Sequence, residues 1–115
     1  MFLTKGVVTS PNYPNNYPNN LEMIETIHIG EGLILSLEFN AFDIEDDYGC
    51  DDDHLTITDD YGTTLMEKSC GSYLPAAITS ISNTVKIMFS TDGYRTESGW
   101  SLNWTAVTAG GFLPF

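Results

Sequence analysis

The stretch of sequence that decides the fold class is Leu33-Ile34-Leu35-Ser36-Leu37-Glu38-Phe39-Asn40. Leucine or phenylalanine stands at every second position from 33 to 39, and polar residues stand between them from position 36 onward. Successive side chains of a β-strand point to opposite faces. This period of two therefore predicts a strand of about eight residues with one apolar face turned towards a core.

Shorter stretches with the same period lie on both sides of it. The further predicted strands are 24–29, 55–57, 85–90 and 100–105. In the last of these, Trp100 and Trp104 point inward and Asn103 points outward. Residues 10–20 hold three prolines and five asparagines, which predicts an irregular, turn-dense segment. Because no stretch shows the period of a helix, the many short strands predict an all-β fold, an antiparallel β-sandwich.

Length and composition limit what such a chain can be. Its 115 residues suffice for one domain, and 42% hydrophobic residues can fill a core. The formal net charge is −12, which excludes nucleic acid and membrane surfaces as partners because both are anionic. The apolar stretches are far shorter than the roughly 20 residues of a membrane-spanning helix. A metal ion or the Lys and Arg side chains of another protein are the partners that this charge favours.

Three local features bear on the cell compartment. Cys50 and Cys70 could form a disulfide or remain two buried thiols, and their number alone does not decide between these states. Asn103-Trp104-Thr105 satisfies the N-x-T pattern of N-linked glycosylation, which makes Asn103 a candidate attachment site and favours an extracellular location. Residues 1–5 lack the pattern of a signal peptide, so we expect that a signal was removed or that the module was excised.

The acidic residues are concentrated between positions 43 and 60. This stretch holds nine of the 16 carboxylates: Asp43, Glu45, Asp46, Asp47, Asp51, Asp52, Asp53, Asp59 and Asp60. Crowded carboxylates repel one another, and a hard cation bound through oxygen relieves that repulsion, which makes calcium the natural ligand. A solvated acidic loop that only aids solubility would give the same density. The stretch does not match an EF-hand, so ligands must come from separate loops, with the turn at 91–94 as a second contributor.

Five motifs follow one another along the chain. The opening one is Ser10-Pro11-Asn12-Tyr13-Pro14-Asn15-Asn16-Tyr17-Pro18. The others are Phe39-Asn40-Ala41-Phe42-Asp43-Ile44-Glu45, then Cys50 with Asp53 and Leu55, then Cys70-Gly71, and finally Phe89-Ser90-Thr91-Asp92 with Gly99-Trp100. Over residues 6–107 they resemble the CUB domain family, whose patterns are S-P-N-Y-P-x-x-Y-P, F-x-x-F-x-L-E, C-x-x-D-x-L, C-G, and F-x-S-D with a later G-F.

The resemblance has consequences for the fold and the cysteines. It implies a jelly-roll-like β-sandwich over 6–107, with a lead-in at 1–5 and a linker or tail at 108–115. It also implies that Cys50 and Cys70 form the family's second disulfide. The sequence departs from the common four-cysteine pattern, because no cysteine stands where the first disulfide would lie.

The resemblance also implies a set of calcium ligands. Calcium-binding members of the family use one glutamate and two aspartates, at positions that match Glu45, Asp53 and Asp92. A main-chain carbonyl two residues beyond the third ligand maps to Tyr94, where the family often has serine. Tyr17 is similar to a tyrosine that hydrogen-bonds a ligand carboxylate and orients it. The three acids could instead be plain surface residues.

Together these features lead to an expected function. The chain is expected to be a non-catalytic module that binds one Ca2+ and a Lys or Arg of a protein partner. It would be secreted or extracellular, or part of the ectodomain of a membrane protein. The partner-binding residues would be Tyr17, Glu45, Asp53, Asp92 and Tyr94. Catalysis is not expected, because the sequence holds no G-x-S-x-G turn and no H-E-x-x-H helix. The alternatives are a homo-oligomer formed through a sheet face or edge, with calcium as a stabiliser, and a carbohydrate-binding module.

Overall fold

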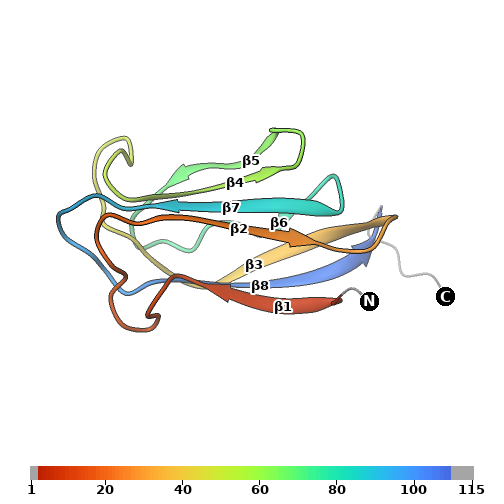
Figure 1. The fold of residues 1–115 in the computed structure, drawn as a ribbon, viewed down its shortest axis with the longest axis horizontal. Helices are drawn as coiled ribbons and strands as arrows, with labels where there is room; N and C mark the ends of the chain where they lie inside the picture. Colours follow the sequence, from red (N-terminus) through yellow and green to blue (C-terminus); the bar gives the residue numbers. More distant parts are fainter. Residues whose placement is uncertain (1–2, 110–115) are drawn as a thin grey trace.

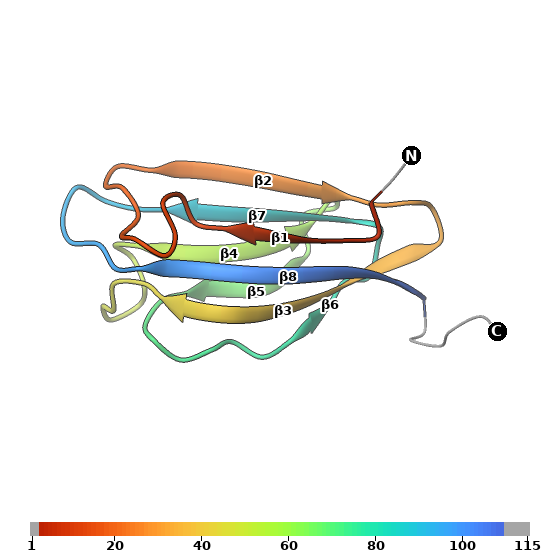
Figure 2. The same ribbon diagram turned by 90° about the horizontal axis from the view of Figure 1, so that it is seen from below.

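A computed structural model describes residues 3–109, and these fold into two antiparallel sheets packed face to face (Figure 1). One sheet has the strand order β1-β8-β3-β6 and the other has the order β2-β7-β4-β5. The strands are β1 (Lys5–Thr9), β2 (Glu22–His28), β3 (Leu33–Asp43), β4 (His54–Asp59), β5 (Thr64–Ser69), β6 (Ile78–Thr79), β7 (Thr84–Ser90) and β8 (Gly99–Thr108). The predicted antiparallel β-sandwich is therefore confirmed, and Figure 2 shows β1, β8 and β3 in the nearer layer.

The core lies between the inner faces of the two sheets. Leu35 and Leu37 of β3 are fully buried, and so are Trp100 and Leu102 of β8, as their alternation predicts. Leu33, at the start of β3, is only half-buried. Each large apolar side chain that leaves water in this way stabilises the fold by about 2 kcal/mol, so the facing strands β3, β7 and β8 hold the two sheets together.

β3 is longer than the predicted strand 33–40, because it continues across a β-bulge to Asp43. Between Phe39 and Ala41 the register with β8 shifts by one residue. The extra residue reverses the alternation, so that Phe42 is buried on an even-numbered position. A strict period of two does not anticipate such a bulge, which is why the predicted strand is too short.

Three strands, β1, β5 and β6, are not predicted from the sequence. β1 and β6 form the edges of one sheet and β5 forms an edge of the other. Along β1 the residues alternate only between exposed and half-buried, and β5 contains no fully buried residue. An edge strand that rests on the rim of the core carries a weak apolar period, so pattern alone does not identify it.

The antiparallel register brings three loops to one end of the sandwich, at the left in Figure 1. β3 ends opposite the start of β8, where Asp43 pairs with Gly99. β7 ends opposite the starts of β2 and β4, since Ser90 pairs with residues of both strands. The loops that meet there are 10–21, 44–53 and 91–98. They contain the predicted ligands and the predicted orienting tyrosine.

The predicted lead-in and tail lie at the two ends of the chain and are only partly described. The predicted tail extends beyond residue 109, and its apolar end at 112–115 lies outside the described residues, as do residues 1–2 of the lead-in. The division into lead-in, domain and tail stays a prediction. Among residues 3–109 there is no helix that is long and apolar enough to cross a membrane.

Candidate metal centre

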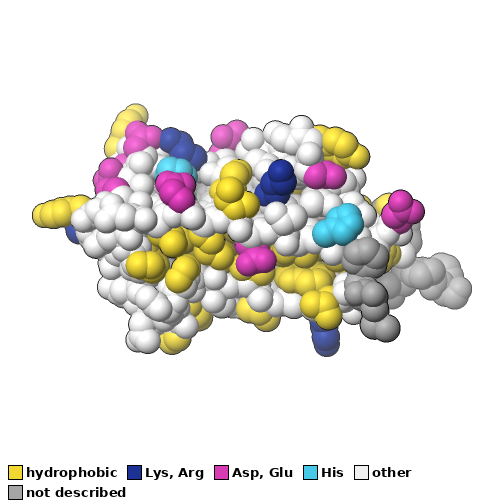
Figure 3. All heavy atoms as spheres, viewed as in Figure 1, with side chains coloured by type: hydrophobic (Ala, Val, Ile, Leu, Met, Phe, Trp, Pro, Cys, Tyr) yellow, Lys and Arg dark blue, Asp and Glu magenta, His cyan; other side chains and the backbone are white. Residues whose placement is uncertain are grey.

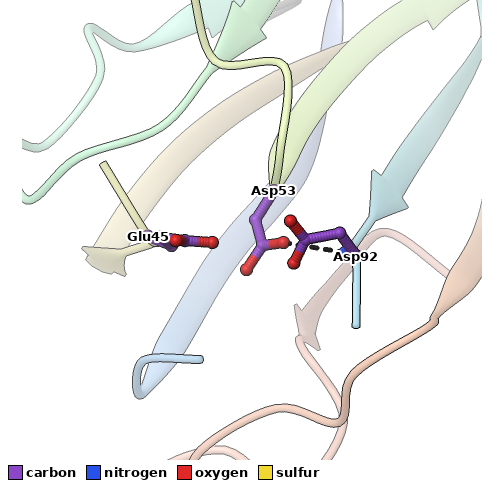
Figure 4. Close-up of side chains that lie close together, drawn as sticks. All are labelled: Glu45, Asp53 and Asp92. Carbon is purple, nitrogen blue, oxygen red and sulfur yellow. Dashed lines mark hydrogen bonds between the residues drawn. The ribbon is translucent and has the colours of Figure 1, made fainter. Parts of the chain in front are cut away.

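Three predicted ligands, Glu45, Asp53 and Asp92, converge at the loop end of the sandwich (Figure 4). Glu45 follows β3, Asp53 precedes β4 and Asp92 follows β7. One carboxylate oxygen from each residue lies within 4.8 Å of the others. Only 4% of Glu45 and 0% of Asp53 are exposed, whereas Asp92 is half-buried. Glu45 and Asp53 are therefore not plain surface acids, whereas Asp92 keeps part of its surface exposed.

Tyr17 joins two of these acids from the turn-dense segment. Its side chain is buried, and its hydroxyl donates a hydrogen bond of 2.7 Å to Oδ2 of Asp53. The same hydroxyl accepts the backbone N–H of Glu45 at 3.0 Å. Its ring packs edge-on against Phe89, with the ring centroids 4.9 Å apart. The segment is therefore anchored in the core and holds the two loops at a fixed separation.

Removal of the Tyr17 hydroxyl tests this arrangement. Tyr17→Phe keeps the ring but leaves the Glu45 N–H and one Asp53 oxygen without their partner, so the carboxylates lose their orientation. Residues that orient metal ligands typically contribute about 10- to 100-fold to metal affinity, and we expect a loss of that size for calcium. Isothermal calorimetry measures it. Tyr13→Phe in the same segment is the matched control, and an equal loss in both variants would contradict the proposed role of Tyr17.

Asp53 and Asp92 are also linked directly. Oδ1 of Asp53 accepts the backbone N–H of Asp92 at 2.9 Å, and Oδ1 of Asp92 accepts the backbone N–H of Tyr94 at 3.1 Å. The backbone N–H of Asn20 donates to the carbonyl oxygen of Asp92 at 2.7 Å. The β7–β8 loop is thus fixed at both the carboxylate and the main chain of Asp92. Tyr94 follows in this loop with an exposed side chain.

One carboxylate oxygen of Glu45, Oε1, is buried without a hydrogen-bond partner among the described residues. A buried oxygen anion without a donor is strongly unfavourable, and two more carboxylates beside it increase the repulsion. A cation bound between the three acids would satisfy this atom, because carboxylate oxygens are the ligands that calcium prefers.

The pKa values of Glu45 and Asp53 are raised for the same reason. Burial raises the pKa of Glu45 above its ordinary value, the charges of Asp53 and Asp92 raise it further, and Arg95 opposes them. Burial also raises the pKa of Asp53, although hydrogen bonds from Asp92 and Tyr17 act in the other direction. Burial raises the pKa of the Tyr17 phenol, which therefore stays protonated and remains a donor to Asp53.

These pKa shifts predict that mild acidification raises the free energy of unfolding in chelator and lowers it in calcium. A carboxyl whose pKa is higher in the folded chain binds its proton more tightly there, so the free energy of unfolding rises as the pH falls from this raised pKa to the ordinary value. Without metal, Glu45→Gln is expected to have a larger free energy of unfolding than the wild type, because it lacks the buried charge. Mild acidification in chelator protonates Glu45 and is therefore expected to reduce this difference. If calcium binds between the three acids, acidification in calcium is expected to lower wild-type stability, because protons would displace the ion. Chemical denaturation of both variants across this pH range measures it, and a difference that is independent of pH would contradict it.

Other acids of the 44–53 loop form hydrogen bonds and an ion pair that shape the loop. The carboxylate of Asp47 accepts the backbone N–H groups of Asp51 and Asp52 at 3.1 and 3.4 Å, and Asp51 forms an ion pair with Lys68 at 2.6 Å. They give the loop its shape and surround the site with negative charge. Figure 3 shows acidic side chains gathered at this end.

A disulfide links the same loop to the residue that follows β5. Cys50 and Cys70 are bonded, which confirms the pairing that the family resemblance implies. Next to it, Ile44 and Gly71 exchange backbone hydrogen bonds of 3.0 and 2.9 Å. The loop between Glu45 and Asp53 is thus attached to the sandwich near its start and near its end.

One basic residue at the site is missing from the sequence-based prediction. Nε of Arg95 lies 3.7 Å from Oε2 of Glu45. The nearest signal in the sequence is that this arginine follows Tyr94 in the predicted second loop. A single arginine in an acidic chain gives no indication of which acid it meets, so the contact could not be predicted.

Asn103 lies away from this site, on the outer face of the sheet β1-β8-β3-β6. Its side chain is exposed, as the alternation of β8 predicts. Asn40 and Asn103 exchange two amide hydrogen bonds of 2.9 and 3.0 Å. Glycosylation of Asn103 stays a prediction.

Comparisons with known proteins bear on the family and the fold of the chain. The family model described as "CUB domain" matches residues 1–104. Cubilin from Rattus norvegicus is 34% identical over 104 residues, which cover 90% of this chain but 3% of cubilin. The crystal structure of the MASP-1 CUB2 domain bound to Ca2+ has a TM-score of 0.83 and 32% identity, and the match covers 91% of this chain and 95% of that domain. The full extracellular region of zebrafish Gpr126/Adgrg6 matches with a TM-score of 0.86 and 25% identity, over 95% of this chain and 14% of that one.

Proposed function

The chain belongs to the CUB domain family, and from that premise we propose that it is an extracellular, non-catalytic module for protein interaction. One calcium ion binds to carboxylate oxygens of Glu45, Asp53 and Asp92. The main-chain oxygen of Tyr94 and water complete the six to eight oxygen ligands that calcium takes. A Lys or Arg of a protein partner then binds to the ordered acidic loops.

The observation that carries the calcium proposal is the buried, unpartnered Oε1 of Glu45 within 4.8 Å of two other carboxylate oxygens. Without a cation this arrangement opposes folding, and with one it stabilises the loops. Supporting it is the likeness to a MASP-1 CUB2 domain that was crystallised bound to Ca2+. Hydrogen bonds from Tyr17 and Asp92 to Asp53 leave lone pairs on both oxygens of Asp53 free for the ion.

Charge supports the second half of the proposal. Three ionised carboxylates and one Ca2+ leave one formal negative charge, so the loaded site still attracts one monovalent cation. A lysine or arginine supplies such a charge together with donors for the carboxylate oxygens that the metal does not use. The net charge of −12 steers basic partners towards the module and makes their association sensitive to salt.

The first experiment is a calorimetric calcium titration, with thermal unfolding recorded in calcium and in chelator. We expect binding to one site, and at calcium concentrations about 100 times the Kd a stabilisation of about 2.7 kcal/mol, or roughly 10 °C in Tm. Magnesium is the matched control, because it demands a smaller and more rigid oxygen shell. No heat and no shift in Tm would refute the calcium site.

The partner half needs its own measurement. The probe is Nα-acetyl-lysine-methylamide, added in saturating calcium and followed by NMR chemical shifts of the loops 44–53 and 91–98. We expect shifts that saturate at millimolar probe and disappear in chelator. The uncharged analogue Nα-acetyl-norleucine-methylamide is the control, and equal shifts with both compounds would refute recognition of a basic side chain.

A further inference from the structure

The chain contains 4 basic residues against 16 acids, and one of them, Arg95, lies on the candidate site. Its Nε is 3.7 Å from Oε2 of Glu45, the oxygen that is not the orphaned Oε1. The Arg95 side chain is 60% exposed, whereas that of Glu45 is 4% exposed. The guanidinium therefore covers the buried carboxylate from the solvent side, which is the side from which a partner approaches.

The formal charge of the calcium-loaded site can be neutralised by one monovalent cation. With three carboxylates and one Ca2+, a single negative charge remains, and either Arg95 or a partner's basic side chain can neutralise it. Both would use the carboxylate oxygens that face solvent. The two cations cannot occupy the same place, and they repel each other when they are close.

We propose that Arg95 is an internal competitor of the partner: it pairs with Glu45 in the free module and leaves when a partner's lysine or arginine binds. This inference rests on the proposed function. Arg95 acts as an autoinhibitory contact that weakens binding of single basic side chains, and a partner must bring further contacts to displace it.

The contact is suited to reversible displacement. An ion pair with an exposed arginine is weak and screened by salt, and the long side chain can swing into solvent. The backbone around it is fixed, since the N–H of Tyr94 bonds to Asp92 and the carbonyl of Glu97 accepts the N–H of Tyr17. Displacement therefore requires movement of the Arg95 side chain and leaves the ligands where they are.

The test is Arg95→Gln, which removes the charge and keeps a polar side chain. Glutamine is chosen over glycine because Arg95 has a φ of 69°, a conformation that glycine adopts more readily than other residues. A glycine there would therefore alter the loop backbone as well as the charge. Lys68→Gln is the matched control, because Lys68 pairs with the nearby Asp51 and touches none of the three ligands. In saturating calcium, Arg95→Gln is expected to bind Nα-acetyl-lysine-methylamide about two- to fivefold more tightly than the wild type, and Lys68→Gln by clearly less.

Calcium affinity gives a second readout. Because the guanidinium repels a cation in the site, Arg95→Gln is expected to bind calcium about two- to fivefold more tightly as well. Unchanged or weaker probe binding in Arg95→Gln overturns the proposal, and so does an equal gain in Lys68→Gln, which would reflect net charge alone. If the wild type binds the probe only in calcium and Arg95→Gln binds it no more tightly, the proposed function is supported and the competitor role of Arg95 is refuted. If neither the wild type nor any variant binds calcium or the probe, both the proposed function and the competitor role are refuted.

Discussion

Asp53→Asn is expected to abolish calcium binding while leaving the sandwich folded. Asp53 is fully buried between Tyr17 and Asp92, so its carboxylate is the central member of the ligand group. An asparagine fills the same volume and keeps one accepting oxygen, but its NH2 group cannot accept from the second of the two donors, the Tyr17 hydroxyl and the Asp92 N–H. It removes one of three charges, and the loss of a direct calcium ligand should exceed the about 10- to 100-fold loss caused by residues that only orient ligands.

The metal-free protein should respond in the opposite direction. In chelator the buried charge of Asp53 repels Glu45 and Asp92, and relief of this repulsion offsets the one hydrogen bond that asparagine loses, so Asp53→Asn is expected to unfold at the same or a higher temperature than the wild type. In calcium it should unfold at a clearly lower temperature, because the ion no longer stabilises it. Calorimetry and thermal unfolding in both buffers measure the two effects.

The adjacent acid provides a matched control. Asp52 is exposed and is not part of the ligand group, so Asp52→Asn makes the same change of charge one residue away. It is expected to reduce calcium affinity only a few-fold through long-range attraction. Equal losses in Asp52→Asn and Asp53→Asn would mean that calcium senses the charge of the loop as a whole, and that the converging carboxylates are not its ligands.

The parts of the fold that were predicted from the sequence are those in which burial is one-sided and continuous. β3, β4, β7 and β8 present apolar side chains to the core at every second position, and their inward faces follow the alternation. β2, which covers most of the predicted strand 24–29, is the exception, because Ile27 is its one buried residue. The bulge after Phe39 and the edge strands β1 and β5 leave no such pattern. Their positions depend on contacts with neighbouring strands, which are distant in the sequence.

The candidate site divides in the same way. The identities of Glu45, Asp53 and Asp92 came from motifs, but their convergence depends on three loops that the antiparallel register brings together. The contact between Arg95 and Glu45 joins residues 50 positions apart in the sequence. Only the folded chain reveals such a pair, because it is specified by loop geometry and not by a local pattern.

The largest expected loss of stability comes from removal of the disulfide. The bond joins residues that are 20 positions apart, and a loop of this length restricts the unfolded chain enough to stabilise the fold by about 3 kcal/mol. Domains of this size are stable by only about 5 to 15 kcal/mol in total. The double variant Cys50→Ser/Cys70→Ser is therefore expected to lose a large share of its stability, measured by urea denaturation in chelator.

The same variant distinguishes two roles of the bond. If the disulfide acts only on the unfolded chain, the loss of stability is equal in calcium and in chelator, and calcium affinity is unchanged. Because Cys50 lies in the loop between Glu45 and Asp53 and the bond attaches that loop to Cys70, we expect calcium affinity to fall as well. The loss of stability is then larger in calcium than in chelator, since binding stabilises the variant less. Backbone bonds between Ile44 and Gly71 keep the start of the loop in place, so calcium binding should be weakened and not abolished. Equal losses in the two buffers would contradict a role of the bond in the site.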